Sequence, residues 1–102
     1  MNKDQQITAT VKEMLDLIKN ISPGKSVELR VPPYGAIHCV AGGNHRRGTP
    51  PNTVEMNAQT LIRLINEPAL WITLCESGEV RASGLLSDLS KVFNQAAVIY
   101  RA

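Results

Sequence analysis

The residues best suited to chemistry lie between His38 and Pro51, a stretch rich in histidine, arginine, glycine and proline. Gly43 to Thr49 reads G-x-x-x-x-G-T, which resembles a phosphate-binding loop that lacks its lysine. Such a loop needs the lysine at the phosphates and a helix directly after it, and Pro50 with Pro51 blocks that helix. We therefore interpret these glycines as part of a connection between two strands.

His45, Arg46 and Arg47 form the basic part of this stretch. Because the guanidinium group of arginine suits carboxylate and phosphate groups, these side chains are candidates for contact with an acidic head group or a protein partner. A solvated basic loop explains the same residues without a ligand. No nucleic-acid partner is predicted, because only Tyr34 lies nearby for base stacking and the net charge is only +2.

Histidine and cysteine do not form a metal-binding or catalytic pattern in this sequence. His38 and Cys39 are neighbours on an expected strand, so they point to opposite faces, and no CxxC or HxxxH spacing occurs. Cys75 has Glu76 beside it but no nearby histidine as a base. We predict no metal site, no cofactor and no catalytic residue, and hence a protein that is not an enzyme.

The composition is typical of one globular domain over residues 1–102, with 43% hydrophobic and 20% charged residues. Cys39 and Cys75 are too few for a disulfide framework, which favours a reduced compartment. Charged residues interrupt every apolar run near the N-terminus, and no run reaches about 18 residues. We predict a cytoplasmic protein without stable membrane insertion, and we make no prediction of its oligomeric state.

Helices are expected in four places. Apolar residues from Ile7 to Ile21 recur at spacings of three and four, which predicts a helix that starts near Thr10, or earlier at Thr8. A second helix follows Asn57, and a last one is capped by Ser87 or Asp88, with the tail from residue 94 extending it or adding a strand. Residues 69–76 suit a strand or a short helix, and we favour a helix.

Strand patterns occupy residues 27–31, 36–40, 53–56 and 80–83. Each alternates apolar and polar residues, so one face of the sheet is expected to be buried and the other solvated. On the solvated face a ladder of opposite charges is expected from Glu28, Arg30, Glu55 and Arg81. The order of elements predicts an α+β domain of two layers, with helices on one face of a mainly antiparallel sheet.

A set of large apolar side chains is expected between the helices and the sheet: Leu61, Leu64, Ile65, Leu70, Trp71, Leu74, Leu89 and Phe93. The simpler interpretation is a packed core, and the sharper one is a cavity that takes an apolar ligand. Leu85 and Leu86 cannot easily both face inward, so one of them is a candidate for a groove or a contact surface.

Several of these segments together resemble the bacterial sterol-carrier-protein-like domains. The resemblance spans residues 7–94 and is carried by VELRVPP at 27–33, HRRGTPPN at 45–52, GEVRASG at 78–84 and SDLS at 87–90. It implies a sheet of about five strands backed by helices on one side, and a helix at residues 69–76. It also implies that sterols, fatty acyl chains or their coenzyme A esters bind in a cavity under the helices.

The function predicted from the sequence is the non-enzymatic binding or transfer of a lipid or another apolar small molecule. The ligand is expected in a cavity between the sheet and the helices, with His45, Arg46 and Arg47 near its head group. The alternative is a protein-interaction module that uses the proline-rich region 32–52 and takes no ligand.

Overall fold

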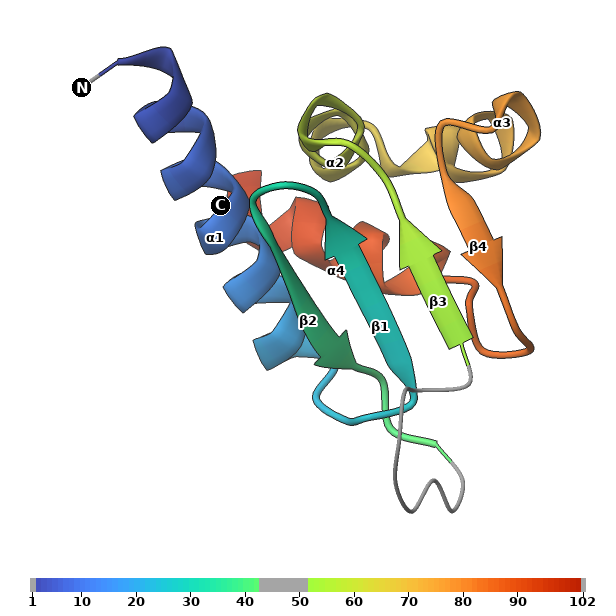
Figure 1. Ribbon diagram of the computed structural model, residues 1–102. Coiled ribbons are helices and arrows are strands. Elements are labelled where there is room, and N and C mark those ends of the chain that lie inside the picture. The colour runs from blue at the N-terminus through green and yellow to red at the C-terminus, as the bar shows by residue number, and fades with distance from the viewer. Residues whose placement is uncertain (1, 43–51, 102) are drawn as a thin grey trace.

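A computed structural model describes residues 2–42 and 52–101 of the chain (Figure 1). In chain order the elements are α1 (Lys3–Ile21), β1 (Val27–Val31), β2 (Gly35–Cys39), β3 (Asn52–Glu55), α2 (Ala58–Asn66), the 3-10 helix η1 (Pro68–Leu70), α3 (Trp71–Ser77), β4 (Arg81–Ser83) and α4 (Ser90–Arg101). Among these described residues, none of the helices has both the length and the apolar character needed to cross a bilayer.

The strands form one mixed sheet in the order β2-β1-β3-β4. β1 pairs antiparallel with β2, and β3 pairs antiparallel with β4, while β1 and β3 run parallel at the centre. The prediction of a mainly antiparallel sheet is confirmed. The described residues contain four strands where the sequence led us to expect about five.

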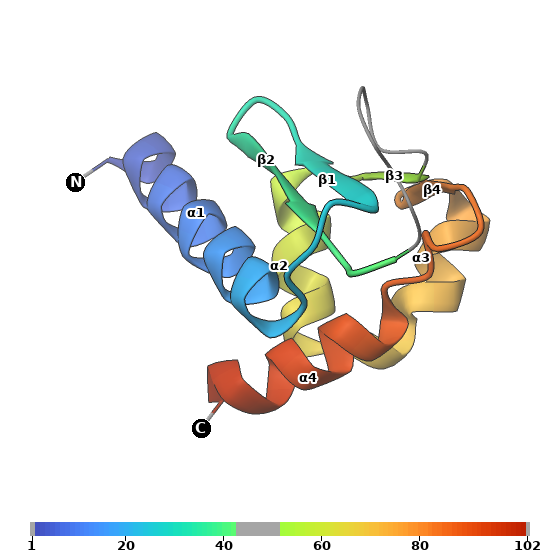
Figure 2. The same cartoon turned by 90° about the horizontal axis from the view of Figure 1, so that it is seen from below.

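The helices cover one face of this sheet and leave the other open. Figure 1 looks onto the open face, and Figure 2, turned by 90°, shows α1, α2 and α4 on the opposite side. These three helices also contact one another, and α1 packs against β2 at the edge of the sheet. The predicted two-layer α+β architecture, with helices on one face, is confirmed.

The alternation within β1 explains why the sheet has two different faces. Val27, Leu29 and Val31 are fully buried beneath the helices, whereas Glu28 and Arg30 between them are only partly buried and face outward. Successive side chains of a strand point to opposite faces of the sheet. The alternation in β1 therefore places apolar side chains on the face that packs against the core and polar side chains on the face that contacts water.

The start of α1 differs from the prediction. The helix begins at Lys3, where Asn2 and Gln5 form a capping box: the Gln5 amide donates to Asn2 Oδ1 at 2.8 Å, and the Asn2 amide donates to Gln5 Oε1 at 3.1 Å. The predicted starts at Thr10 and Thr8 are wrong. The first turns of α1 are largely exposed, so they lack the apolar periodicity on which the prediction relied.

Two ambiguous segments are helical. Residues 68–77 form η1 and α3, and α3 ends at Gly78, whose φ of 84° lies in the left-handed region that favours glycine. The tail continues α4 to Arg101 instead of adding a strand. Asp88 lies just before α4, and its carboxylate accepts the Ser90 amide at 2.9 Å, close to the predicted cap.

Candidate functional site

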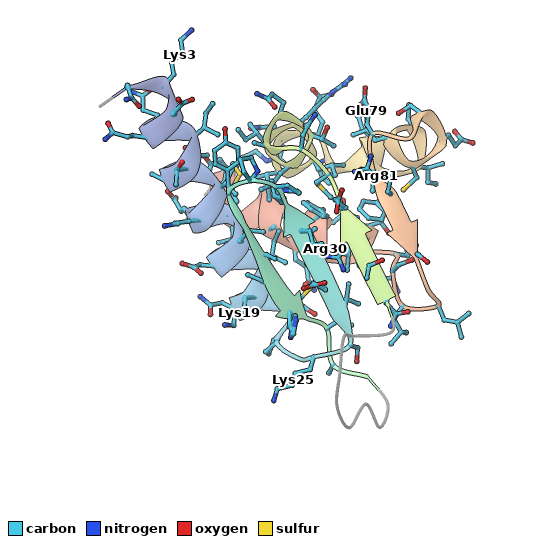
Figure 3. All side chains as sticks on the ribbon, viewed as in Figure 1. Lys3, Lys19, Lys25, Arg30, Glu79 and Arg81 are labelled. Carbon is cyan, nitrogen blue, oxygen red and sulfur yellow. The ribbon has the colours of Figure 1, made fainter. Side chains whose placement is uncertain are left out.

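The open face of the sheet carries the predicted charge ladder, and strand register explains it. Arg30 lies opposite Glu55, and Glu55 lies opposite Arg81. Arg30 Nε donates to Glu28 Oε1 at 2.7 Å, Arg30 Nη1 lies 3.8 Å from Glu55 Oε1, and Arg81 pairs with the other oxygen of Glu55. Figure 3 shows Arg30 and Arg81 on the open face. His38 extends the ladder to β2, with its Nε2 3.8 Å from Glu28.

A hollow of about 480 Å³ opens beside this ladder. Its lining comes from the two central strands, β4 and the end of α3: Arg30, Thr53, Glu55, Cys75, Gly78, Val80, Arg81, Ala82 and Ser83. The two arginines at its wall are balanced by two carboxylates, because Glu55 pairs with both of them and Glu28, next to the wall, also pairs with Arg30. The hollow therefore offers little unbalanced charge with which to attract an ion from water.

Cys75 lines this hollow and carries a thiol, which is a potential nucleophile. Burial raises the pKa of its thiol above the ordinary value, and the nearby negative charges of Asp88 and Glu76 raise it further. Since the thiolate is the reactive form, Cys75 stays a weakly reactive thiol at neutral pH. Burial also raises the pKa of Cys39, to about 11, which suits a core residue.

The predicted strand geometry keeps His38 and Cys39 apart. Cys39 is fully buried, whereas His38 lies exposed on the opposite face of β2. Within residues 2–42 and 52–101, histidine, cysteine and acidic side chains do not gather in groups of three or more that could hold a metal ion.

The eight predicted ligand-binding residues converge on the helix side of the sheet. Leu61, Leu64 and Ile65 come from α2, Leu70 from η1, Trp71 and Leu74 from α3, Leu89 from the residue before α4, and Phe93 from α4. All except Leu70 are at most 5% exposed and belong to one hydrophobic cluster. The rings of Trp71 and Phe93 lie 5.8 Å apart at an interplanar angle of 31°. Leu70 is partly buried at the rim of this cluster.

A second apolar feature lies where the end of α1 meets the second half of α4. Ile21, Gln95, Val98 and Ile99 line a hollow of about 480 Å³. Val98 and Ile99 are 68% and 52% exposed, so the outer side of α4 keeps apolar surface in water. From the sequence we expected the tail from residue 94 to extend the last helix or to add a strand, and no pattern indicated this contact with α1.

A comparison with known protein families identifies the family of this chain. The family described as bacterial SCP ortholog matches residues 3–94 of the chain. This protein belongs to the bacterial SCP ortholog family. The resemblance to sterol-carrier-protein-like domains is thereby confirmed. A search of the curated proteins finds no match for the chain.

A solved structure shares the fold of this SCP ortholog. It is named "UbiJ-SCP2 Ubiquinone synthesis protein", and it superposes with a TM-score of 0.57 at 17% sequence identity. The match covers 100% of this chain and 98% of that chain. At this identity the likeness concerns the fold alone, and it agrees with the α+β architecture described above.

One residue of this SCP ortholog has a structural role that the sequence did not reveal. Asn52 is only 4% exposed, and its amide bridges two distant segments: Nδ2 donates to the Ser26 carbonyl at 2.8 Å, and Oδ1 accepts the Leu86 amide at 2.9 Å. It therefore connects the residue before β1 to the loop between β4 and α4. No local pattern could have indicated these bonds, because the partners lie 26 and 34 residues away.

The predicted head-group residues His45, Arg46 and Arg47 lie outside the described residues. Leu85 and Leu86, of which we expected one to line a groove or contact surface, are both exposed, at 100% and 42%. Leu86 lies against Gly42, where a Cβ atom would meet its Cδ1 at 2.7 Å.

Proposed function

We propose that this protein binds a lipid or another apolar small molecule without catalysing a reaction, in a space that opens between the sheet and the helices. The observation that carries the proposal is the convergence of the eight apolar side chains from α2, η1, α3 and α4. Membership of the bacterial SCP ortholog family supports it.

Binding in this region requires movement, since seven of the eight side chains are at most 5% exposed. A ligand enters as these side chains part, and α4 and the η1–α3 segment are the elements that separate. Pockets of this kind belong to a minor conformation that the ligand stabilises. Leu70 lies at the partly buried rim, so the ligand contacts it on entry. Apolar burial supplies about 25 cal/mol per Å² before the ordering costs are subtracted.

Contact of His45, Arg46 and Arg47 with an acidic head group stays a prediction, because these residues lie outside the described part of the chain. The structural neighbour is named for ubiquinone synthesis. Long-chain quinones therefore join fatty acids and phospholipids among the molecules to be sought.

The first test is to purify the protein from its own host and to identify bound molecules by native mass spectrometry and organic extraction. We expect an apolar molecule in stoichiometric amount. The protein stripped of lipid is then titrated with a dansyl-labelled fatty acid. Leu70→Ala should weaken this binding about tenfold, because it removes apolar contact at the rim.

The matched control is Leu17→Ala on α1, which truncates another leucine that packs partly buried against the same core. It should lower stability to a similar extent and leave the affinity for the probe unchanged. Equal effects of the two variants on affinity would contradict the proposed location. A protein with no bound molecule and no saturable probe binding would contradict the function itself and favour the interaction module of residues 32–52.

A further inference from the structure

A hollow of about 400 Å³ lies where the end of α1 meets the edge strand β2. Its wall comes from α1, the loop between α1 and β1, and the strands β1 and β2, and it includes Lys19, Lys25, Glu28 and His38. It shares no lining residue with the hollow beside the charge ladder, and none of the eight apolar residues of the proposed ligand site lines it. This hollow is therefore a separate feature, and its charged side chains decide what it can bind.

The loop that carries Lys25 is held against the end of β2. The Val40 amide donates to the Ser22 carbonyl at 2.7 Å, and the Ser26 amide donates to the Val40 carbonyl at 3.1 Å. Gly24 has a φ of 152°, and a Cβ atom there would collide with the Val40 carbonyl, so this position requires glycine. The backbone is thus fixed on both sides of Lys25, and the lysine is held beside β2.

Glu28 brings a negative charge to the wall of this hollow, but other partners already balance it. Its Oε1 accepts a hydrogen bond from Arg30 Nε at 2.7 Å, and its Oε2 lies 3.8 Å from His38 Nε2. Among the residues that the structure describes, neither Lys19 nor Lys25 forms a salt bridge with a carboxylate. The sequence of residues 43–51 contains no aspartate or glutamate either. Both lysine charges are therefore available to a ligand.

The two lysines outweigh the negative end of the helix beside them. Figure 3 shows Lys19 and Lys25 at the end of the molecule where α1 finishes. The carbonyl end of a helix is equivalent to about half a negative charge. Asp16 lies one turn before Lys19 on α1, but it does not line the hollow. Since each lysine contributes a full positive charge and three N–H donors, the hollow favours a small ligand with more than one negative charge.

We infer that this hollow binds the phosphate group of a small soluble molecule, with Lys19 and Lys25 as its cationic contacts. A phosphate ester carries about −1.5 to −2 charges at pH 7, so it gains more from two lysines than a carboxylate does. The hollow of about 400 Å³ also has room for part of the molecule that carries the phosphate. Because both lysines are exposed, the binding is weak, and it weakens further as salt is added.

The test follows the backbone amide resonances of the isotope-labelled full chain by NMR while inorganic phosphate or glycerol phosphate is added at constant pH and ionic strength. We expect saturable shifts at Lys25, Ser26 and His38. Lys19→Gln and Lys25→Gln should each weaken the binding about fivefold, because each removes one positive charge next to the phosphate. Both lysines are exposed, so both variants should fold normally.

Two control variants remove the same charge elsewhere. Lys3→Gln changes the start of α1, at the opposite end of the molecule in Figure 3, and Lys91→Gln changes an exposed position on α4. Neither should change the affinity for phosphate. Tighter binding of glycerol phosphate supports a phosphate ester as the ligand, and equal affinities support free phosphate. The inference is overturned if the shifts do not saturate, if sodium chloride reproduces them, or if the control variants lose as much affinity as the variants at Lys19 and Lys25.

The same variants separate this inference from the proposed function. Lys25→Gln should bind the dansyl-labelled fatty acid as the parent chain does, because Lys25 lies outside the hydrophobic cluster that contains the proposed ligand site. Weaker phosphate binding with retained probe binding supports the phosphate site. If the parent chain binds phosphate but no probe, the proposed function fails and the phosphate site stands.

Discussion

The two faces of the sheet are made by the same strands and behave in opposite ways. On the covered face, Val27, Leu29 and Val31 are fully buried against the helices. On the open face, Glu28 and Arg30 from the same strand join a chain of charge pairs that stays in contact with water. The covered face therefore supplies most of the free energy of unfolding, and the charges on the open face add little.

The largest loss of stability is expected from a substitution on the covered face. Phe93 is fully buried and packs beside Trp71. Phe93→Ala should lower the free energy of unfolding by about 3–5 kcal/mol, because it removes apolar contacts and leaves a cavity. Urea denaturation measures this change. Tyr100→Ala on the same helix is the control: Tyr100 is 39% exposed, and the change should stay within about 1 kcal/mol. Similar losses in both variants would mean that the core does not lie where we describe it.

A smaller loss of stability is expected from a substitution on the open face. Glu55 pairs with Arg30 and Arg81, yet its side chain is 30% exposed and that of Arg81 is 68% exposed. Glu55→Gln should therefore lower the free energy of unfolding by about 1 kcal/mol or less. The difference from the parent chain should shrink as salt is added, since salt screens exposed charges. A loss as large as that of Phe93→Ala would show that the ladder is a second source of stability.

The smallest effect is a pH dependence at the start of α4. Hydrogen bonds from Ser90 lower the pKa of the Asp88 carboxyl below its ordinary value. A lowered folded-state pKa stabilises the fold above the unfolded pKa of about 3.9, and the contribution is lost as pH falls through the folded value. Asp88→Asn should therefore be less stable than the parent chain near pH 7, with the difference shrinking at about pH 3. Thermal unfolding at both pH values measures it, and a difference independent of pH would contradict this role.

Much of the fold could be predicted because the central strands alternate regularly between apolar and polar residues. The alternation in β1 assigned both faces and placed Glu28 and Arg30 on the open one, and the same reasoning applied to the other strand patterns placed Glu55 and Arg81. The start of α1 could not be found, because its first turns are exposed and only the Asn2–Gln5 capping box defines them. The segment 69–76 was ambiguous, since its apolar residues suit a strand as well as a helix that packs on the core.

The candidate sites were less predictable, because they depend on contacts between distant residues. The sequence identified the apolar set around Trp71, but composition alone does not separate a packed core from a cavity. The bridge made by Asn52 joins residues from different strands and loops, so no local pattern contains it. The adjacent Leu85 and Leu86 were expected to supply one exposed side chain, but the sequence did not show that both are exposed on a loop whose Leu86 amide is bound by Asn52.

The shortness of β4 has a consequence for the behaviour of this protein at high concentration. An exposed strand at the margin of a sheet can template pairing with another molecule, which leads to aggregation. Here one edge strand, β4, has only three residues, and it begins with the charged residue Arg81. The other margin, β2, is packed against α1 and follows Pro32 and Pro33. Both margins thus discourage edge-to-edge polymerisation, and the sheet can keep one face bare without growing into fibrils.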